Sequence, residues 1–123
     1  MIRQLFRFFI LLFLISACEE IVNEENISND SVQLLAPSNE AVLATKQKIA
    51  FNWEVLGGAD SYQLQIATPD FVTATQIQLD TLVSRTDITI DSLIARSYEW
   101  RVKGLNSAYE TGYSAHIFTV VEP

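Results

Sequence analysis

The chain has 123 residues, with 8 basic and 15 acidic side chains and a formal net charge of −7. This balance argues against nucleic-acid binding, which needs clustered Lys and Arg to neutralise phosphates, and against electrostatic adhesion to anionic lipid. The length accommodates one domain of about 90 residues together with a leader and a linker.

The N-terminal segment has the order of a secretory signal peptide. Arg3 and Arg7 form a basic start, residues 8–14 are all apolar, and small residues precede Cys18. A membrane-spanning helix needs about 20 apolar residues, and the uninterrupted run from Phe8 to Ala17 is too short for that. We therefore expect residues 1–17 to be a signal peptide rather than a transmembrane anchor.

The end of this segment, Ile15-Ser16-Ala17-Cys18, resembles the lipobox of bacterial lipoproteins. In that family the cysteine sulfur receives a diacylglyceryl group, the chain is cut before the cysteine, and the new N-terminus is acylated, as with palmitate. The resemblance implies a mature protein that begins at Cys18 and is held in the cell envelope by lipid. We expect the outer membrane, with the periplasmic or surface-facing side left open. Cys18 is the only cysteine, so an intrachain disulfide is excluded.

Residues 18–31 are acidic and polar, with five carboxylates and no basic side chain. Like-charged polar segments stay extended because they cannot bury enough apolar surface to offset the entropy of ordering. This composition predicts a flexible tether over residues 18–31, followed by one domain over residues 32–123.

The rest of the chain shows short apolar–polar alternation of period two, separated by turn residues, and no helical period. Such spacing, roughly every ten residues, predicts an all-β protein, a seven-stranded antiparallel β-sandwich. The expected strands are residues 32–39, 48–54, 61–67, 75–82, 87–91, 97–103 and 113–121.

The alternation also predicts which side chains point inward. We expect Trp53, Tyr98 and Trp100 to fill the core, and Ile77 to face it as well. His116 is in phase with inward positions of the last strand, which makes it either a wall of the core or a rim residue.

Some of these positions form an ordered set that consists of Trp53, Gly58-Ala59, Tyr62 to Ala67, Leu93, Tyr98 to Val102, Asn106 and Ser114. This set resembles a fibronectin type III domain across nearly all of residues 32–121. The resemblance implies that Trp53 fills the core, that Tyr98 with Leu93 forms a tyrosine corner, and that the domain is a binding module or a spacer.

The sequence offers no catalytic constellation. There is no Gly-x-Ser-x-Gly motif and no glycine-rich phosphate loop. His116 is the only histidine, and Cys18 is expected to be acylated, so no nucleophile and base occur together. We expect no enzyme activity, no cofactor and no metal site.

Loop aromatics are the remaining candidates for ligand binding. Phe71 follows a strand-breaking Pro, and Tyr109, Glu110 and Tyr113 lie in the non-periodic stretch 106–113 before the last strand. Rigid aromatic surface next to adaptable polar groups suits contacts to a protein or carbohydrate partner. The alternative is that Phe71 and Tyr113 pack on the edge of the sandwich, with Tyr109 the residue expected to be exposed.

We interpret the sequence as that of a lipid-anchored, non-catalytic binding or display module. The alternative is a structural subunit or spacer of an outer-membrane complex. A glycan binder should present flat aromatic rings on one surface, whereas a subunit should show an uncovered edge strand or an apolar patch. Three tripeptides also resemble O-glycan acceptors of some Gram-negative bacteria, although turn formation explains them equally well. They are Asp30-Ser31-Val32, Asp80-Thr81-Leu82 and Asp91-Ser92-Leu93.

Overall fold

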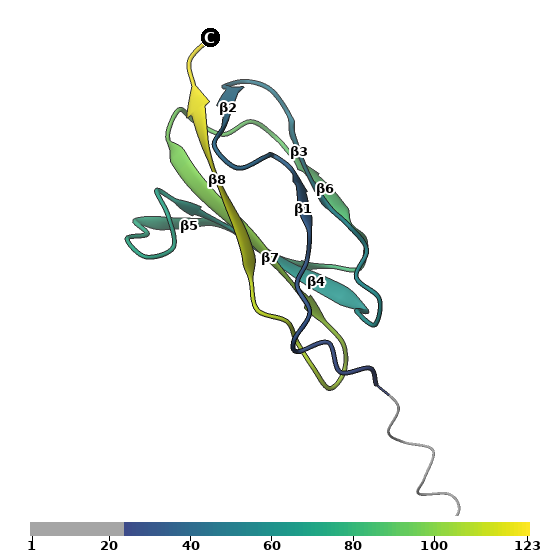
Figure 1. Cartoon of the computed structure of the whole chain (residues 1–123). Coiled ribbons are helices and arrows are strands. Elements are labelled where there is room, and N and C mark those ends of the chain that lie inside the picture. Colours follow the sequence, from purple (N-terminus) through teal and green to yellow (C-terminus); the bar gives the residue numbers. More distant parts are fainter. Residues whose placement is uncertain (1–23) are drawn as a thin grey trace, which may run out of the picture.

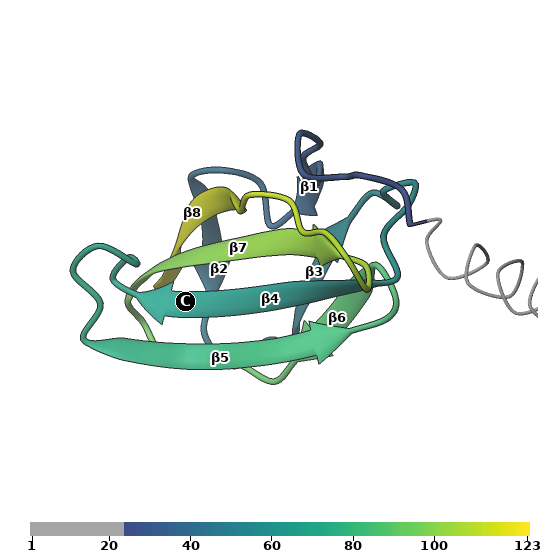
Figure 2. The same cartoon turned by 90° about the horizontal axis from the view of Figure 1, so that it is seen from below.

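The computed structural model describes residues 24–123, which form a two-layer β-sandwich (Figures 1 and 2). Cys18 and the predicted signal peptide, residues 1–17, lie outside the described residues. No helix in the described range is long and apolar enough to cross a membrane. The strands are β1 (Leu34–Ala36), β2 (Ala41–Ala44), β3 (Ile49–Trp53), β4 (Ser61–Thr68), β5 (Gln76–Val83), β6 (Asp87–Ile90), β7 (Ser97–Leu105) and β8 (Ser114–Val121).

One sheet has three strands in the order β1-β3-β6, and the other has five in the order β2-β8-β7-β4-β5. The predicted all-β sandwich is confirmed, but residues 24–123 hold eight strands rather than seven. The additional strand is β2, which pairs in parallel with β8, whereas the other pairs are antiparallel. Its sequence, Ala-Val-Leu-Ala, has no polar alternation, and this explains why the pattern missed it.

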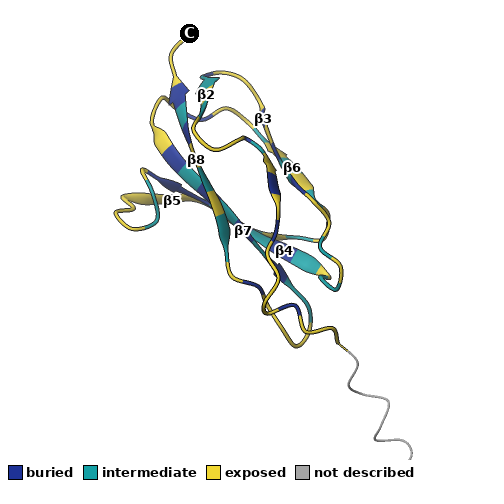
Figure 3. Cartoon of the chain, viewed as in Figure 1, coloured by how far each residue is buried: buried dark blue, intermediate teal, exposed yellow. Residues whose placement is uncertain are grey.

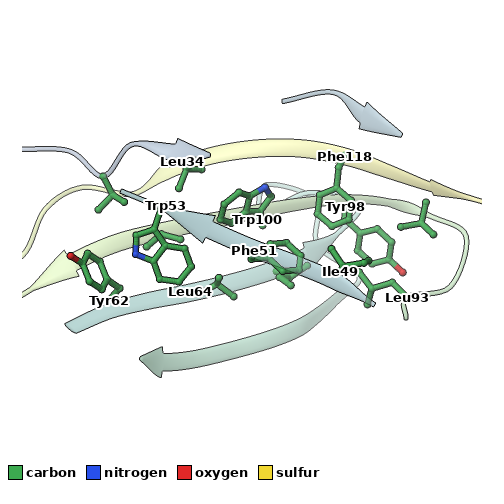
Figure 4. Packing of buried hydrophobic residues seen from close by; sticks show 14 residues of the cluster. Leu34, Ile49, Phe51, Trp53, Tyr62, Leu64, Leu93, Tyr98, Trp100 and Phe118 are labelled. Atoms are coloured by element: carbon green, nitrogen blue, oxygen red, sulfur yellow. The ribbon is translucent and has the colours of Figure 1, made fainter. Parts of the chain in front are cut away.

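Aromatic side chains from both sheets interlock in the core (Figure 4). Phe51 of β3 meets the edge of Trp100 from β7 at a centroid distance of 5.1 Å and the edge of Phe118 from β8 at 5.9 Å. Tyr98 stacks on Phe118 at 5.3 Å. Each large side chain buried in this way stabilises the fold by about 1.5–3 kcal/mol.

The predicted core tryptophans and tyrosine are confirmed. The exposed fractions of Trp53, Tyr98 and Trp100 are 2 %, 1 % and 0 %. The indole Nε1 of Trp100 donates a hydrogen bond to the carbonyl oxygen of Pro37 at 3.2 Å, which ties the core to the segment after β1.

The expectation that Ile77 faces the core is wrong, because its side chain is 51 % exposed. The pairing of β4 with β5 shifts register between Ile66 and Ala67, so that Ile77 lies opposite Ala67. A β-bulge adds one residue to a strand and reverses the side of the sheet that later residues face. Leu79, on the other side of the unpaired residue Gln78, still packs against the core.

The predicted tether is also wrong for the part that is described, residues 24–31. Ile27 is fully buried, and its Cγ2 would lie only 2.8 Å from a Cβ added to Gly58, which has a φ of +89°. Asn106 Nδ2 donates to the carbonyl oxygens of Glu25 at 2.7 Å and Gly58 at 3.0 Å. The ordered domain therefore begins by residue 24, beside the β7–β8 hairpin (Figure 1).

Candidate functional site

The outer face of the five-stranded sheet carries two neighbouring cations. Along β7 the burial alternates, so that Trp100 and Val102 point into the core while Arg101 and Lys103 lie on the opposite, half-buried face. Positive charge is scarce on this acidic chain. Two adjacent outward cations on one strand therefore mark a distinct surface.

Arg101 lies between two aromatic rings that come from different loops. Its Cζ is 3.8 Å from the centroid of the Phe71 ring and 4.1 Å from that of Tyr113. Its Nε donates a hydrogen bond to Gln65 Oε1 on β4 at 2.8 Å. Each cation–π contact of this kind is worth about 0.5–1 kcal/mol near the surface. The guanidinium is thus held in one orientation by three elements of the fold.

Phe71 is positioned by the loop between β4 and β5. Its backbone N–H donates to Glu99 Oε1 on β7 at 2.9 Å. Asp70 Oδ1 accepts hydrogen bonds from the backbone N–H of Thr73 at 2.7 Å and from its hydroxyl at 2.8 Å. These bonds hold the pKa of Asp70 below its ordinary value, because they favour the ionised carboxylate. The loop is therefore tied down on both sides of the ring.

Tyr113 contacts both cations of the surface. Lys103 Nζ lies 4.9 Å from the centroid of its ring and 3.3 Å from Glu110 Oε2. The Lys103 side chain is 16 % exposed and that of Glu110 is 58 % exposed. Glu110 therefore compensates part of the positive charge at this end of the surface, whereas within residues 24–123 Arg101 forms no salt bridge.

The hairpin that carries Tyr113 is held by its own polar groups. Asn106 Oδ1 accepts hydrogen bonds from the backbone N–H groups of Ala108 at 3.0 Å and Tyr109 at 2.8 Å, an arrangement that favours a turn. The hydroxyl of Thr111, which is buried, accepts from the N–H of Gly104 and donates to the carbonyl of Gly112. These hydrogen bonds hold the hairpin in one conformation.

We name the residues Phe71, Gln65, Arg101, Lys103, Glu110 and Tyr113 the outer cluster. Three of the four predicted site residues belong to it: Phe71 from the β4–β5 loop, and Glu110 and Tyr113 from the β7–β8 hairpin. The fourth, Tyr109, is exposed at 38 % as expected, and contributes none of these cation contacts. Phe71 and Tyr113 are half-buried and pack on Arg101, not on the core.

Sequence reasoning placed Arg101 and Lys103 on the polar face of their strand but did not select them as site residues. The alternation contained the signal for their outward direction. The alternation does not show that the β4–β5 loop and the β7–β8 hairpin converge on this face.

No protein-family model matches the sequence, and no curated protein matches it either. Solved structures do resemble the fold. The crystal structure of a domain titled FN3tt superposes with a TM-score of 0.54 at 8 % identity, covering 75 % of this chain and 97 % of that one. The fibronectin type III domain of the human collagen alpha-1(XX) chain gives a TM-score of 0.56 at 15 % identity, covering 85 % and 94 %.

This chain has the fibronectin type III fold. The likeness at such low identity extends to the fold, so function has to be argued from the residues of this chain. One hallmark of the fold is present in full: the hydroxyl of Tyr98 donates to the carbonyl oxygen of Ile94 at 2.8 Å, which confirms the expected tyrosine corner. Burial raises the pKa of Tyr98, and Leu93 lies in the core beside it.

His116 forms part of the wall of this fibronectin type III core. Its ring lies edge-on to Trp100 with a centroid distance of 6.0 Å, and its Nδ1 is 3.2 Å from the carbonyl oxygen of Pro37. Over residues 24–123, no three His, Cys, Asp or Glu side chains are grouped so as to hold a metal ion.

The three tripeptides singled out in the sequence occupy different environments. Ser31 and Ser92 are exposed, whereas Thr81 lies half-buried within β5. A hydroxyl inside a regular strand is poorly placed for an enzyme to modify. The hydroxyl of the Asp80-Thr81-Leu82 tripeptide is therefore less accessible for modification than those of the other two tripeptides.

Proposed function

We propose that this protein is a lipid-anchored, non-catalytic binding module of the cell envelope that presents the outer face of its five-stranded sheet to a protein or glycan partner. The anchoring rests on the resemblance of Ile15-Ser16-Ala17-Cys18 to a lipobox, with the outer membrane as the proposed location. The binding role rests on the outer cluster.

The single observation that carries this proposal is the position of Arg101 between Phe71 and Tyr113. A guanidinium has five N–H groups, and among residues 24–123 its hydrogen-bond acceptor is Gln65, through Nε alone. The terminal N–H groups are left to donate to a carboxylate or carbonyl of a partner. Because the rings already fix the side chain, binding costs little additional conformational entropy.

The arrangement of the rings favours a protein partner over a glycan. Phe71 and Tyr113 each use one ring face to contact Arg101, so they do not form the open aromatic platform that a sugar ring needs. Arg and Tyr are, in contrast, the residue types enriched at the centres of protein interfaces. We therefore place a protein with an exposed carboxylate first among the possible partners.

The membrane attachment is tested by Cys18→Ala. This variant should lose membrane retention completely, because the sulfur is the attachment point that the lipobox resemblance implies. Cell fractionation followed by detection of bound lipid measures it, and Ser16→Ala serves as a control that keeps the cysteine. A Cys18→Ala chain that still sediments with membranes in lipid-modified form contradicts the anchoring.

The binding role is tested by recovery of partners from detergent-solubilised envelopes. Arg101→Ala should lose the partner, whereas Arg85→Ala, which removes an exposed Arg paired only with Asp87, should retain it. Both variants are first checked by thermal melting. Equal recovery by the two variants contradicts the assignment of the outer cluster as the contact surface.

A second candidate function, a structural subunit of an outer-membrane complex, is favoured by a different observation. The sandwich has a long edge strand, β5, that no other described element covers. A subunit that docks through its sheet edge would present this kind of feature.

A further inference from the structure

β5 is the last strand at one side of the five-stranded sheet and pairs with β4 alone (Figure 2). An edge strand carries a row of unpaired N–H and C=O groups, which proteins commonly protect with a Lys, a Pro or a very short strand. β5 has eight residues and contains no Lys, Arg or Pro. The other edge strands, β1, β2 and β6, have three or four residues each.

The usable part of this edge runs from Leu79 to Val83. These residues pair with β4 in unbroken register, whereas the bulge interrupts the ladder nearer to Gln76. Five residues of extended chain offer about 17 Å of regular backbone. All eight residues of β5 are exposed or half-buried (Figure 3).

A hollow of about 170 Å³ lies beside the edge, between β5 and the segment that follows β6. Because Gln78 and Leu79 are its lining residues on β5, a strand added to β5 would bring one of its inward-facing side chains, beside Leu79, over this hollow. That side chain must be apolar, because Leu79 and Ile90 line the hollow and are only partly buried by the rest of the core. The lining residues are Gln78, Leu79, Ile90, Asp91, Ser92 and Leu93.

The charges at this edge are negative. Asp80 lies on β5 and Asp91 lines the hollow, and within residues 24–123 neither forms an ion pair. Of the cations near this edge, Arg85 in the β5–β6 turn is already 3.0 Å from a carboxylate oxygen of Asp87, Lys46 lines a separate hollow with Ser92 and Leu93, and Lys48 directly precedes β3 beside the end of β6. A second copy of this chain would bring the same carboxylates to the shared edge and would add its own net charge of −7. Charge complementarity therefore selects a basic segment of a different protein.

We propose that the free edge of β5 binds one extended, basic segment of another protein, apolar at alternate positions, which adds to the five-stranded sheet as a further strand. The backbone of Leu79 to Val83 supplies hydrogen bonds, the hollow receives an aliphatic side chain, and Asp80 and Asp91 attract Lys or Arg. This site rests on the second candidate function and deepens it by naming the chemistry of the partner, and it uses the sheet edge and not the outer cluster.

The test uses the full chain in a neutral detergent and a short synthetic peptide in which Val alternates with Lys. One matched peptide carries N-methyl groups on alternate backbone nitrogens, and another has Glu in place of Lys. The Lys peptide should bind, and both matched peptides should bind at least about tenfold more weakly, because they lose the backbone bonds or the charge attraction. Fluorescence anisotropy measures affinity, and hydrogen exchange should show new protection of residues 79–83.

A charge-reversed protein provides the reciprocal test. The double variant Asp80→Lys, Asp91→Lys should prefer the Glu peptide, with an unchanged melting temperature as the control for folding. Arg101→Ala should bind the Lys peptide as the parent chain does, which separates this site from the outer cluster. The proposal is overturned if the Lys peptide does not bind, if N-methylation has no effect, if protection appears away from β5, or if the chain alone forms a dimer that protects β5.

Discussion

The protein contains two aromatic clusters on opposite faces of β7, and they differ in what they touch. The inner cluster joins Phe51, Trp100 and Phe118 from three strands in full burial. The outer cluster joins Phe71 and Tyr113 through the charged side chain of Arg101, half-exposed to solvent. Removal from water makes the first a source of stability, whereas contact through a solvated cation leaves the second available for a partner.

The largest expected effect is on the inner cluster. Trp100→Ala should destabilise the domain by about 3–5 kcal/mol, because it opens a cavity among fully buried neighbours and removes the hydrogen bond to Pro37. That is a large part of the stability of a small domain. Urea denaturation of residues 24–123 measures it. A variant that melts like the parent chain would place Trp100 outside the structural core.

A second effect tests whether the N-terminal segment belongs to the stable part of the molecule. Ile27→Ala should cost about 2–4 kcal/mol, since the side chain is fully buried against Gly58. Asn29→Ala, which changes an exposed residue of the same segment, is the matched control and should leave the melting temperature unchanged. Equal melting of the two variants would restore the original expectation of a flexible tether up to residue 31.

The two faces of β7 could be predicted from the sequence because strict alternation assigns each residue to one side. Residues whose placement depends on contacts distant in the chain could not be predicted in this way. The prediction that Ile77 faces the core was wrong because a bulge shifts the register, and no residue type in the sequence indicates this bulge. The burial of Ile27 was missed because an apolar residue with carboxylates nearby in the sequence looks solvated until the structure shows it packed on Gly58, with Asn106 holding the backbone of Glu25 beside it.

The outer cluster shows the same limit. Phe71 and Arg101 are thirty positions apart in the chain, and only the folding of β4 beside β7 brings them within 3.8 Å. Residue types predicted that loop aromatics were candidates, yet the cation that organises them is visible only in the assembled sheet. The sequence therefore indicated Phe71, Glu110 and Tyr113 as candidates but not Arg101, which lies at the centre of the outer cluster.

A smaller effect concerns the tyrosine corner. Tyr98→Phe should cost about 1 kcal/mol at neutral pH, because the carbonyl of Ile94 loses its donor. Burial raises the pKa of Tyr98, so the unfolded chain ionises first as the pH rises past about 10, and the folded state loses stability above that pH. The parent chain should therefore lose more stability than Tyr98→Phe between pH 8 and pH 11 in urea titrations. Parallel losses in the two proteins would show that Tyr98 does not carry the alkaline dependence.

The smallest expected effect on stability, and the most direct test of the contrast between the clusters, is the free energy of unfolding of Arg101→Ala. The two cation–π contacts of Arg101 are worth about 0.5–1 kcal/mol each, and because the rings can repack on Gln65 and Lys103 once the guanidinium is removed, we predict a net loss below about 1 kcal/mol. Urea denaturation of Arg101→Ala beside the parent chain measures this value. A loss of about 3 kcal/mol or more, comparable to that of a buried Trp, would contradict the account by making the outer cluster a part of the structural core.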